Sequence, residues 1–216
     1  MTTTIGILAL QGDFAEHAAI LRNLDARTIE VRRPEQLTGL DGLIIPGGES
    51  TTIGRLLHQW QLLTPIRERA RDGMAVWGTC AGAILLAERA ADLDCEGLRL
   101  MDIAIERNAF GRQIDSFEAD LSVPALGAAP FRAVFIRAPI IDHMGPKAQA
   151  LASLANGTVV AAQQAKLLAT AFHPELTDDP RFHQHFLRLA APAICAPPEE
   201  VDRPLAGPTA SDGEPR

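Results

Sequence analysis

The sequence predicts an α/β fold, with a doubly wound, mostly parallel central sheet flanked by helices and an antiparallel extension. The first half of the chain alternates short apolar runs with helical patterns, which is typical of a parallel sheet covered on both faces. The second half holds strand patterns with few helices between them, which indicates antiparallel or mixed pairing on the same sheet. The 216 residues suit one domain of this class, and we expect residues 1–190 to form it.

The elements of the first half follow from local patterns. Residues 4–10 (TIGILAL) form an apolar run that predicts a buried strand, and residues 14–24 place apolar side chains at helical spacing. Further strands are predicted at residues 28–31, 42–46 and 74–77, and further helices at residues 51–63, 65–71 and 83–91. Pro65 suits the first turn of its helix, because this turn leaves backbone N–H groups unpaired and proline has none.

Strand patterns dominate the second half of the chain. They lie at residues 102–106, 117–121, 131–136, 158–163 and 167–172, and a last helix is predicted near residues 180–189. From Cys195 to Arg216 the chain holds five prolines and few apolar residues. We therefore expect residues 191–216 to form a disordered, acidic, proline-rich tail.

Composition narrows the possible functions. Acidic residues outnumber basic ones by 27 to 20, and the net charge of −7 argues against a protein whose main role is to bind nucleic acid or an anionic membrane. The three cysteines show no CxxC spacing that would suggest zinc, and neither a signal peptide nor a membrane-spanning apolar run is visible. We therefore expect a cytoplasmic protein that acts on a small molecule and needs neither a metal nor another cofactor.

The strongest local signal is the segment GTCAG at residues 78–82, between a predicted strand and a predicted helix. A sharp strand-to-helix turn lifts its central side chain above the sheet edge, and the flanking glycines relieve the crowding. The helix N-terminus behind Cys80 favours the thiolate, which is the reactive form. Most single cysteines are buried and inert, but this context predicts a nucleophile at Cys80.

A cysteine nucleophile needs a base, and the chain has six histidines. Only His173 follows a predicted strand and has an acid two residues on, at Glu175. In extended backbone alternate residues point the same way, and Pro174 keeps the segment out of a helix, so Glu175 can orient the imidazole. For any one of the other five histidines, a surface position in a turn is the favoured interpretation. His183 and His185 diverge by roughly 200° on a helix, which argues against a shared metal ion.

A third motif, PGGESTT at residues 46–52, joins a predicted strand to a predicted helix. Backbone N–H groups in such a glycine turn can receive an oxyanion or another anionic group. Ser50 or Thr51 is also expected to cap the helix, which explains part of the motif structurally. The motif lacks the GK[ST] ending of a Walker A loop, and its place beside the expected position of Cys80 favours a role in the same site.

Two polar clusters lie where apolar strands should not need them, at residues 106–118 and 135–139. A run of charges usually marks a solvated face. An arginine at the mouth of a cysteine site would instead suit a substrate carboxylate, because a guanidinium binds it through two hydrogen bonds. Both interpretations stay open from these residues alone.

Together the motifs resemble a known family, the glutaminase subunit of pyridoxal 5′-phosphate synthase. The similarity runs in order from about Ile5 to Phe186, through LALQGDFAEH, RRPEQL, DGLIIPGGESTT, WGTCAGAILLA, ERNAFGRQIDSFEADL, VFIRAP and TAFHPELTDD. GTCAG and HPE alone would indicate only the wider class I, or triad, glutamine amidotransferases, whose flavodoxin-like fold is thereby implied. GGEST, ERNxFGRQxDSFE and IRAP single out this branch.

The resemblance implies an enzyme that hydrolyses L-glutamine to L-glutamate and ammonia through a cysteine thioester. It implies the nucleophile at Cys80, the general base and acid at His173, and the orienting acid at Glu175. The positions that match the glutamine-binding residues of the family are Gly48, Glu49, Ser50, Arg107, Ile136 and Arg137. We expect backbone N–H groups of Ala81 and of the turn at Gly48 to hold the oxyanion.

The resemblance also implies a partner for the chain. The ammonia would pass to a synthase that forms a ring-shaped dodecamer of β/α-barrels, with one glutaminase per synthase subunit, and builds the cofactor from a pentose phosphate and a triose phosphate. Gln11 matches a residue of the partner-facing loop that helps to couple the two subunits. Family members are weak until docked, and a flexible Gly47–Gly48 turn that reorients on docking would explain this.

Some features depart from the family pattern, and other functions stay open. Ala83 and Ala165 stand where a larger aliphatic residue and a glycine are usual, but neither is a catalytic candidate. The alternatives are a triad amidotransferase that serves another synthase, a cysteine hydrolase of similar topology, and a binding module with a vestigial site. The HPE and GGES motifs argue against the hydrolase, and the matched nucleophile and base argue against the binding module.

Overall fold

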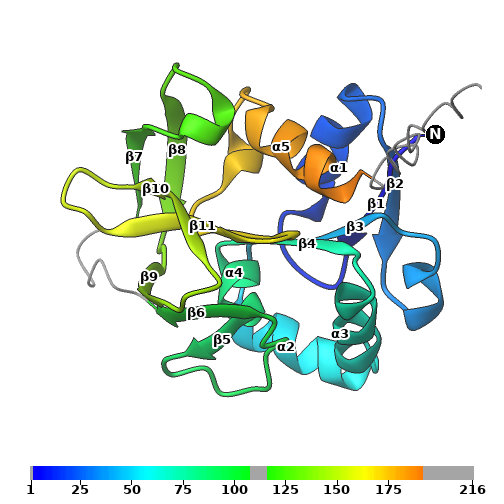
Figure 1. Cartoon of the computed structure of the whole chain (residues 1–216). Coiled ribbons are helices and arrows are strands. Elements are labelled where there is room, and N and C mark those ends of the chain that lie inside the picture. The colour runs from blue at the N-terminus through cyan, green and yellow to red at the C-terminus, as the bar shows by residue number, and fades with distance from the viewer. Residues whose placement is uncertain (1, 108–115, 192–216) are drawn as a thin grey trace, which may run out of the picture.

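The structure, a computed structural model, describes residues 2–107 and 116–191. Its strands are β1 (Thr4–Leu8), β2 (Arg27–Val31), β3 (Gly42–Ile45), β4 (Ala75–Thr79), β5 (Ala87–Ala90), β6 (Met101–Glu106), β7 (Ser116–Leu121), β8 (Phe131–Ile136), β9 (Ile140–Met144), β10 (Gln149–Ser153), β11 (Val159–Gln164) and β12 (Leu167–Thr170). Ten of them form one sheet in the order β2-β1-β3-β4-β12-β11-β9-β6-β5, with β10 paired to β11 (Figure 1). The expected tail lies outside the described residues from residue 192 onward, as does segment 108–115 of the first polar cluster.

One half of the large sheet is parallel, as predicted. β2, β1, β3, β4 and β12 are neighbours that all run in the same direction. β3 and β4 are buried along their whole length, because helices cover both faces of this part of the sheet. The carboxyl ends of β1, β3, β4 and β12 therefore meet at one edge, which is where ligands bind in sheets of this kind.

The other half of the sheet is mixed. β11, β9 and β6 continue it in antiparallel pairs, and β5 ends it in parallel with β6. Two strands expected in this extension, at residues 117–121 and 131–136, instead form the separate two-stranded sheet of β7 and β8. That expectation was wrong because a local pattern identifies a strand but not the sheet it joins. β9 and the half-exposed edge strand β10 were not predicted, since neither carries a clear apolar alternation.

The helices cover the sheet in two layers. α1 (Phe14–Asn23) and α5 (Arg181–Ala190) lie on one face, and α2 (Ser50–Gln59), α3 (Leu63–Arg71) and α4 (Ala81–Leu86) lie on the other (Figure 1). Three short 3₁₀ turns, η1 (Pro34–Leu37), η2 (Pro124–Leu126) and η3 (Pro174–Leu176), each begin with proline. Among the described residues, no helix is both long and apolar enough to cross a bilayer.

The helix predicted at residues 83–91 ends early, at Leu86. The carbonyls of Leu85 and Leu86 accept hydrogen bonds from the backbone N–H groups of Leu98 and Leu100, at 2.6 and 3.0 Å, in place of the N–H groups that would continue the helix. The residues after Leu86 become β5 and pair with β6. The prediction was wrong because helix propensity is a weak preference that this tertiary pairing overrides.

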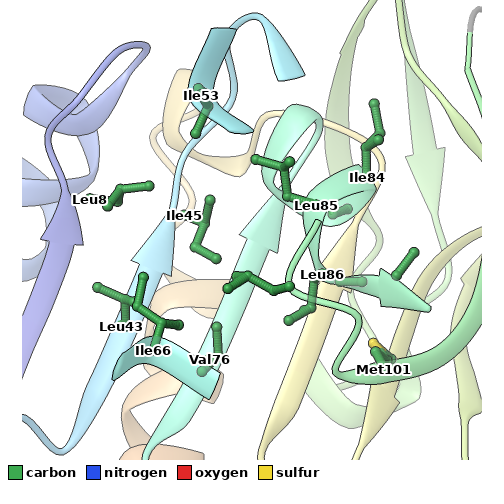
Figure 2. Packing of buried hydrophobic residues seen from close by; sticks show 14 of the residues in the cluster. Leu8, Leu43, Ile45, Ile53, Ile66, Val76, Ile84, Leu85, Leu86 and Met101 are labelled. Carbon is green, nitrogen blue, oxygen red and sulfur yellow. The ribbon is translucent and has the colours of Figure 1, made fainter. Parts of the chain in front are cut away.

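Two hydrophobic clusters hold the layers together. On the side of α1 and α5, Ile44 and Trp77 pack with the rings of Phe182 and Phe186. On the other side, side chains of β3, β4 and α4 converge with those of α2 and α3 (Figure 2). Because side chains alternate along a strand, each central strand contributes to both clusters and its end is fixed from both sides.

Candidate active site

A pocket of about 360 Å³ opens at the edge where the carboxyl ends of the parallel strands meet. It contains nearly every residue that the sequence pointed to, although these lie in six separate segments of the chain. Its lining consists of Gln11, Asp13, Gly48, Glu49, Ser50, Cys80, Ala81, Ile84, Arg107, Ile136, Arg137 and His173. Glu175 is the expected site residue that does not line the pocket, because it is buried behind His173.

Cys80 occupies a strained turn between β4 and α4. Its φ of 46° and ψ of −104° lie in a region that side chains rarely adopt. A Cβ on Gly78 would lie 2.4 Å from the backbone of Gly82, and a Cβ on Gly82 would lie 1.9 Å from the carbonyl oxygen of Ile45. The two glycines of GTCAG are therefore sterically required, and the expected elbow geometry is present.

His173 and Glu175 follow β12 and contact each other directly. His173 Nδ1 is 2.7 Å from Glu175 Oε1, and the backbone N–H of His173 donates to the carbonyl of Val134 at 2.9 Å. The segment is not extended as expected, because Pro174 begins the 3₁₀ turn η3. The tight turn brings the two side chains together by a different backbone path.

Charge and burial set the protonation of this pair. Burial lowers the pKa of His173, but hydrogen bonds and electrostatic attraction from Cys80 and Glu175 outweigh burial and raise that pKa to about 10. Burial raises the pKa of Glu175, and His173 opposes this increase. An imidazole that is protonated at neutral pH and lies beside a cysteine can donate its proton to a leaving group.

The glycine turn after β3 packs against the loop that follows β1. Gly48 has a φ of +147°, and a Cβ there would lie 2.6 Å from Gln11 Oε1. Gln11 Oε1 also accepts a hydrogen bond from the backbone N–H of Glu49, at 2.8 Å. The expected cap by Ser50 or Thr51 is absent, because Ser50 is already the first residue of α2 and Glu49 stands at the N-cap without a side-chain bond.

Opposite charges face each other at the pocket mouth. Arg107 Nη2 lies 3.6 Å from Glu49 Oε1, and Arg107 Nη1 donates to the carbonyl of Asp92 at 2.5 Å. Arg137 has a φ of 43°, and Ile136 before it places its carbonyl oxygen 3.9 Å from Cys80 Sγ. The two polar clusters therefore supply charged side chains to the pocket as well as a solvated surface.

Sequence reasoning missed Asp13 and Ile84 in the pocket and His17 behind it. His17 and His183 are fully buried, so their interpretation as surface residues was wrong. His17 does fall on the apolar face marked by Phe14, Ala18 and Leu21, and that spacing could have indicated burial.

Two groups of side chains bear on the question of a metal. His183 contacts His17, whereas His185 Nε2 lies 2.8 Å from Gln163 Oε1, so the two histidines diverge as expected. Asp13, His173 and Glu175 place ligand atoms within 4.8 Å of one another. Since His173 Nδ1 and Glu175 Oε1 already bond to each other, this group is better described as an acid–base pair than as a metal site.

Comparison with known proteins finds relatives that belong to one group of glutamine amidotransferases. The family model described as "SNO glutamine amidotransferase family" matches residues 7–191. The chain is 61% identical to pyridoxal 5′-phosphate synthase subunit PdxT of Herpetosiphon aurantiacus, over 86% of this chain and 100% of that protein. It is 58% identical to the subunit of the same name from a Roseiflexus species, with the same coverage.

Solved structures have the same fold. A crystal structure of a glutamine amidotransferase is similar with a TM-score of 0.81 and 48% identity, covering 86% of this chain and 98% of the other. The structure of PurLQS from Thermotoga maritima has a TM-score of 0.67 at 13% identity, over 87% of this chain and 99% of the other, which supports the fold alone.

Proposed function

The chain belongs to the SNO glutamine amidotransferase family, and from this we propose that it is the glutaminase subunit of a pyridoxal 5′-phosphate synthase, hydrolysing L-glutamine to L-glutamate and ammonia. The observation that carries the proposal is the series of contacts from Cys80 through His173 to Glu175 at a charged pocket. A different triad amidotransferase is less well supported, because the curated relatives at 52–61% identity carry the name of this one synthase subunit.

The first half of the reaction forms a thioester. The thiolate of Cys80 attacks the side-chain amide carbon of glutamine, a C–S bond forms, and the carbonyl electrons move to the oxygen. When this intermediate collapses, His173 gives its proton to the amide nitrogen, the C–N bond breaks and ammonia leaves. The second half reverses these roles: neutral His173 takes a proton from water, the hydroxide attacks the thioester carbon, and glutamate leaves as Cys80 returns to the thiolate.

The negative oxygen of each intermediate needs donors. The backbone N–H groups of Ala81 and Gly48 both belong to residues that line the pocket beside Cys80. Each such donor contributes about 3 kcal/mol to the stability of the transition state. The conformation of the glycine turn therefore controls the rate.

The charged mouth of the pocket suits a free amino acid. Glu49 would bind the α-ammonium group of glutamine, and Arg107 and Arg137 would bind its α-carboxylate. Arg107 and Glu49 lie 3.6 Å apart, and their opposite charges would suit the two charged groups of a zwitterion. Ser50 and Ile136 complete the wall around the substrate.

The ammonia passes to the synthase, which we propose is a dodecameric ring of β/α-barrels that carries one glutaminase per barrel in the cytoplasm. Gln11 would couple docking to catalysis, and its contacts with Gly48 and with the backbone of Glu49 support this role. A partner that moves Gln11 would change the glycine turn directly. No cofactor is needed for the chemistry of this chain.

The decisive experiment measures the release of ammonia from glutamine with and without the synthase subunit. We expect strong stimulation by the synthase, because docking would orient the N–H groups of the glycine turn. Cys80→Ala should abolish turnover in the complex while glutamine binding, measured by calorimetry, is retained. Turnover by Cys80→Ala, or full activity of the isolated wild-type chain, would contradict the proposal.

A further inference from the structure

Behind Glu175, on the side away from the pocket, two histidines continue the polar contacts into the protein interior. His17 on α1 and His183 on α5 are both fully buried. His17 Nε2 lies 3.3 Å from Glu175 Oε2, and His17 Nδ1 lies 2.9 Å from His183 Nε2. The contacts that begin at Cys80 therefore reach both helices on this face of the sheet.

Burial fixes the charge of these two histidines. Burial lowers the pKa of His17 well below 6.5, and the nearby His183 and His173 add to this effect. Burial alone lowers the pKa of His183 to about 3. Both imidazoles are therefore neutral at physiological pH, and each carries a single N–H group.

The contacts then decide which nitrogen holds each hydrogen. His17 Nε2 faces Glu175 Oε2 and Thr79 Oγ1, and an ionised carboxylate only accepts, so the hydrogen of His17 lies on Nε2. His17 Nδ1 then has no hydrogen, so His183 Nε2 carries one and donates it to His17 Nδ1. This order leaves His183 Nδ1 without a hydrogen, and that atom has no hydrogen-bond partner among the described residues.

Glu175 needs such a neighbour because its two oxygens are held unequally. Oε1 is 2.7 Å from His173 Nδ1, whereas Oε2 is buried and meets no strict hydrogen-bond geometry within the described part of the chain. His17 Nε2 lies 3.3 Å from this second oxygen, outside hydrogen-bond geometry, and 3.4 Å from Thr79 Oγ1, so a small rotation of either side chain would let its N–H group donate to Oε2. Without it, a buried carboxylate oxygen would face an apolar interior, which favours rotation or protonation of the group.

We propose that His17 is a positioning residue of the glutaminase reaction, which holds Oε2 of Glu175 so that Oε1 stays on His173. His183 sets the tautomer of His17 that this role requires. The inference rests on the proposed function and adds to it a residue outside the pocket, which acts on substrate only through Glu175 and His173.

The test compares His17→Leu with His17→Gln in the complex with the synthase subunit. Leucine removes the donor, and we expect kcat to fall roughly 10- to 100-fold with little change in KM, the size of loss seen when an outer-shell partner of a metal-bound histidine is removed. The Gln side chain can place an amide N–H near the position of Nε2, so His17→Gln should recover most of kcat. A merely structural role would not distinguish the two variants in this way.

The pH profile gives a second readout. Three titratable groups among the residues that the structure describes face Glu175: His173 from its own segment, Asp13 from the loop before α1, and His17 from α1. His183 on α5 in turn faces His17. Loss of the N–H group at Oε2 favours protonated Glu175, so the acid limb of the kcat profile should move to higher pH in His17→Leu. In a Glu175→Gln background the same substitution should have no further effect.

Leu21→Ala is the matched control, because Leu21 is buried on the same helix one turn later and carries no polar group. It should lower thermal stability without the loss of kcat. Equal losses of kcat in Leu21→Ala and His17→Leu at equal stability would overturn the proposal, as would an unchanged kcat in His17→Leu.

A measurement on the unaltered protein covers the case in which His17→Leu does not fold. Nitrogen-15 NMR of the histidine side chains should show neutral His17 with its hydrogen on Nε2. A hydrogen on Nδ1, or a charged ring at pH 7, would refute the inference. Absence of glutaminase activity in the wild-type complex would instead refute the proposed function, so the two failures are distinguishable.

Discussion

At the residue scale, the chemistry of the site depends on side chains whose neighbours determine their protonation. The same burial that keeps His17 and His183 neutral raises the pKa of Glu175, whereas Cys80 and Glu175 together raise the pKa of His173 to about 10. Neutral and protonated histidines therefore stand on the two sides of Glu175, with His17 on one side and His173 on the other. The motifs pointed to Cys80, His173 and Glu175, whereas the apolar helix face on which His17 lies indicated at most its burial and not its contact with Glu175.

The buried histidines make stability sensitive to acid. The folded-state pKa of His183 is about 3, while in the unfolded chain it is near 6.5, so unfolding takes up a proton between these values. The stability that depends on a neutral His183 is fully present above pH 6.5. The free energy of unfolding then decreases by about 1.4 kcal/mol per pH unit as the pH falls toward 3. His183→Gln should reduce the slope of the unfolding free energy between pH 6 and pH 4 by that amount, measured by urea denaturation.

The exposed His143 on β9 supplies the control for this prediction. His143→Gln should leave the slope as it is in the wild type. A slope that is equally steep in His183→Gln would mean that other groups are responsible for the acid sensitivity.

At the element scale, pairing decides where helices and strands end. The run AILLAERA has a helical pattern, yet only its first part is helical, because the chain from Leu98 to Leu100 takes the carbonyls of Leu85 and Leu86. The turn between β11 and β12 shows the opposite case, in which the backbone requires a positive φ but the sequence supplies no glycine. Ala165 has a φ of 49°, where the family pattern commonly has glycine.

This turn can be improved. Ala165→Gly should raise the free energy of unfolding by about 1 kcal/mol, because the left-handed conformation costs alanine that much relative to glycine. Ala150→Gly, at an exposed position of β10 that is not among the residues with positive φ, should lower it by about 0.5–1 kcal/mol. Chemical denaturation of both variants tests the prediction, and the same sign for the two would contradict it.

At the scale of the whole molecule, the site exists because the parallel sheet brings four strand ends to one edge. Both hydrophobic clusters and the pocket lining listed above are formed by described residues up to Ala191. The curated relative from Herpetosiphon aurantiacus is matched over its entire length by 189 residues of this chain. We therefore propose that neither the folded unit nor its chemistry requires residues 192–216.

Removal of residues 192–216 tests this conclusion. The free energy of unfolding should change by less than about 0.5 kcal/mol, as for changes outside the packed structure. Glutaminase activity in the presence of the synthase should stay within twofold of the full chain. If stimulation by the synthase is lost while the fold is intact, the tail has a role in docking that we do not expect.

The sequence by itself determined most of the alternation of strands and helices in the first half, the elbow around Cys80, and which acid pairs with His173, although the 3₁₀ turn that joins His173 to Glu175 was not predicted. These follow from residue type and spacing over a few positions, which set local backbone geometry. Only the tertiary structure decided that residues 117–121 and 131–136 leave the main sheet, that the helix after Cys80 stops at Leu86, and that His17 and His183 stand behind Glu175. Each of these depends on contacts between segments far apart in the chain. The energies of such contacts cannot be read from a local sequence pattern.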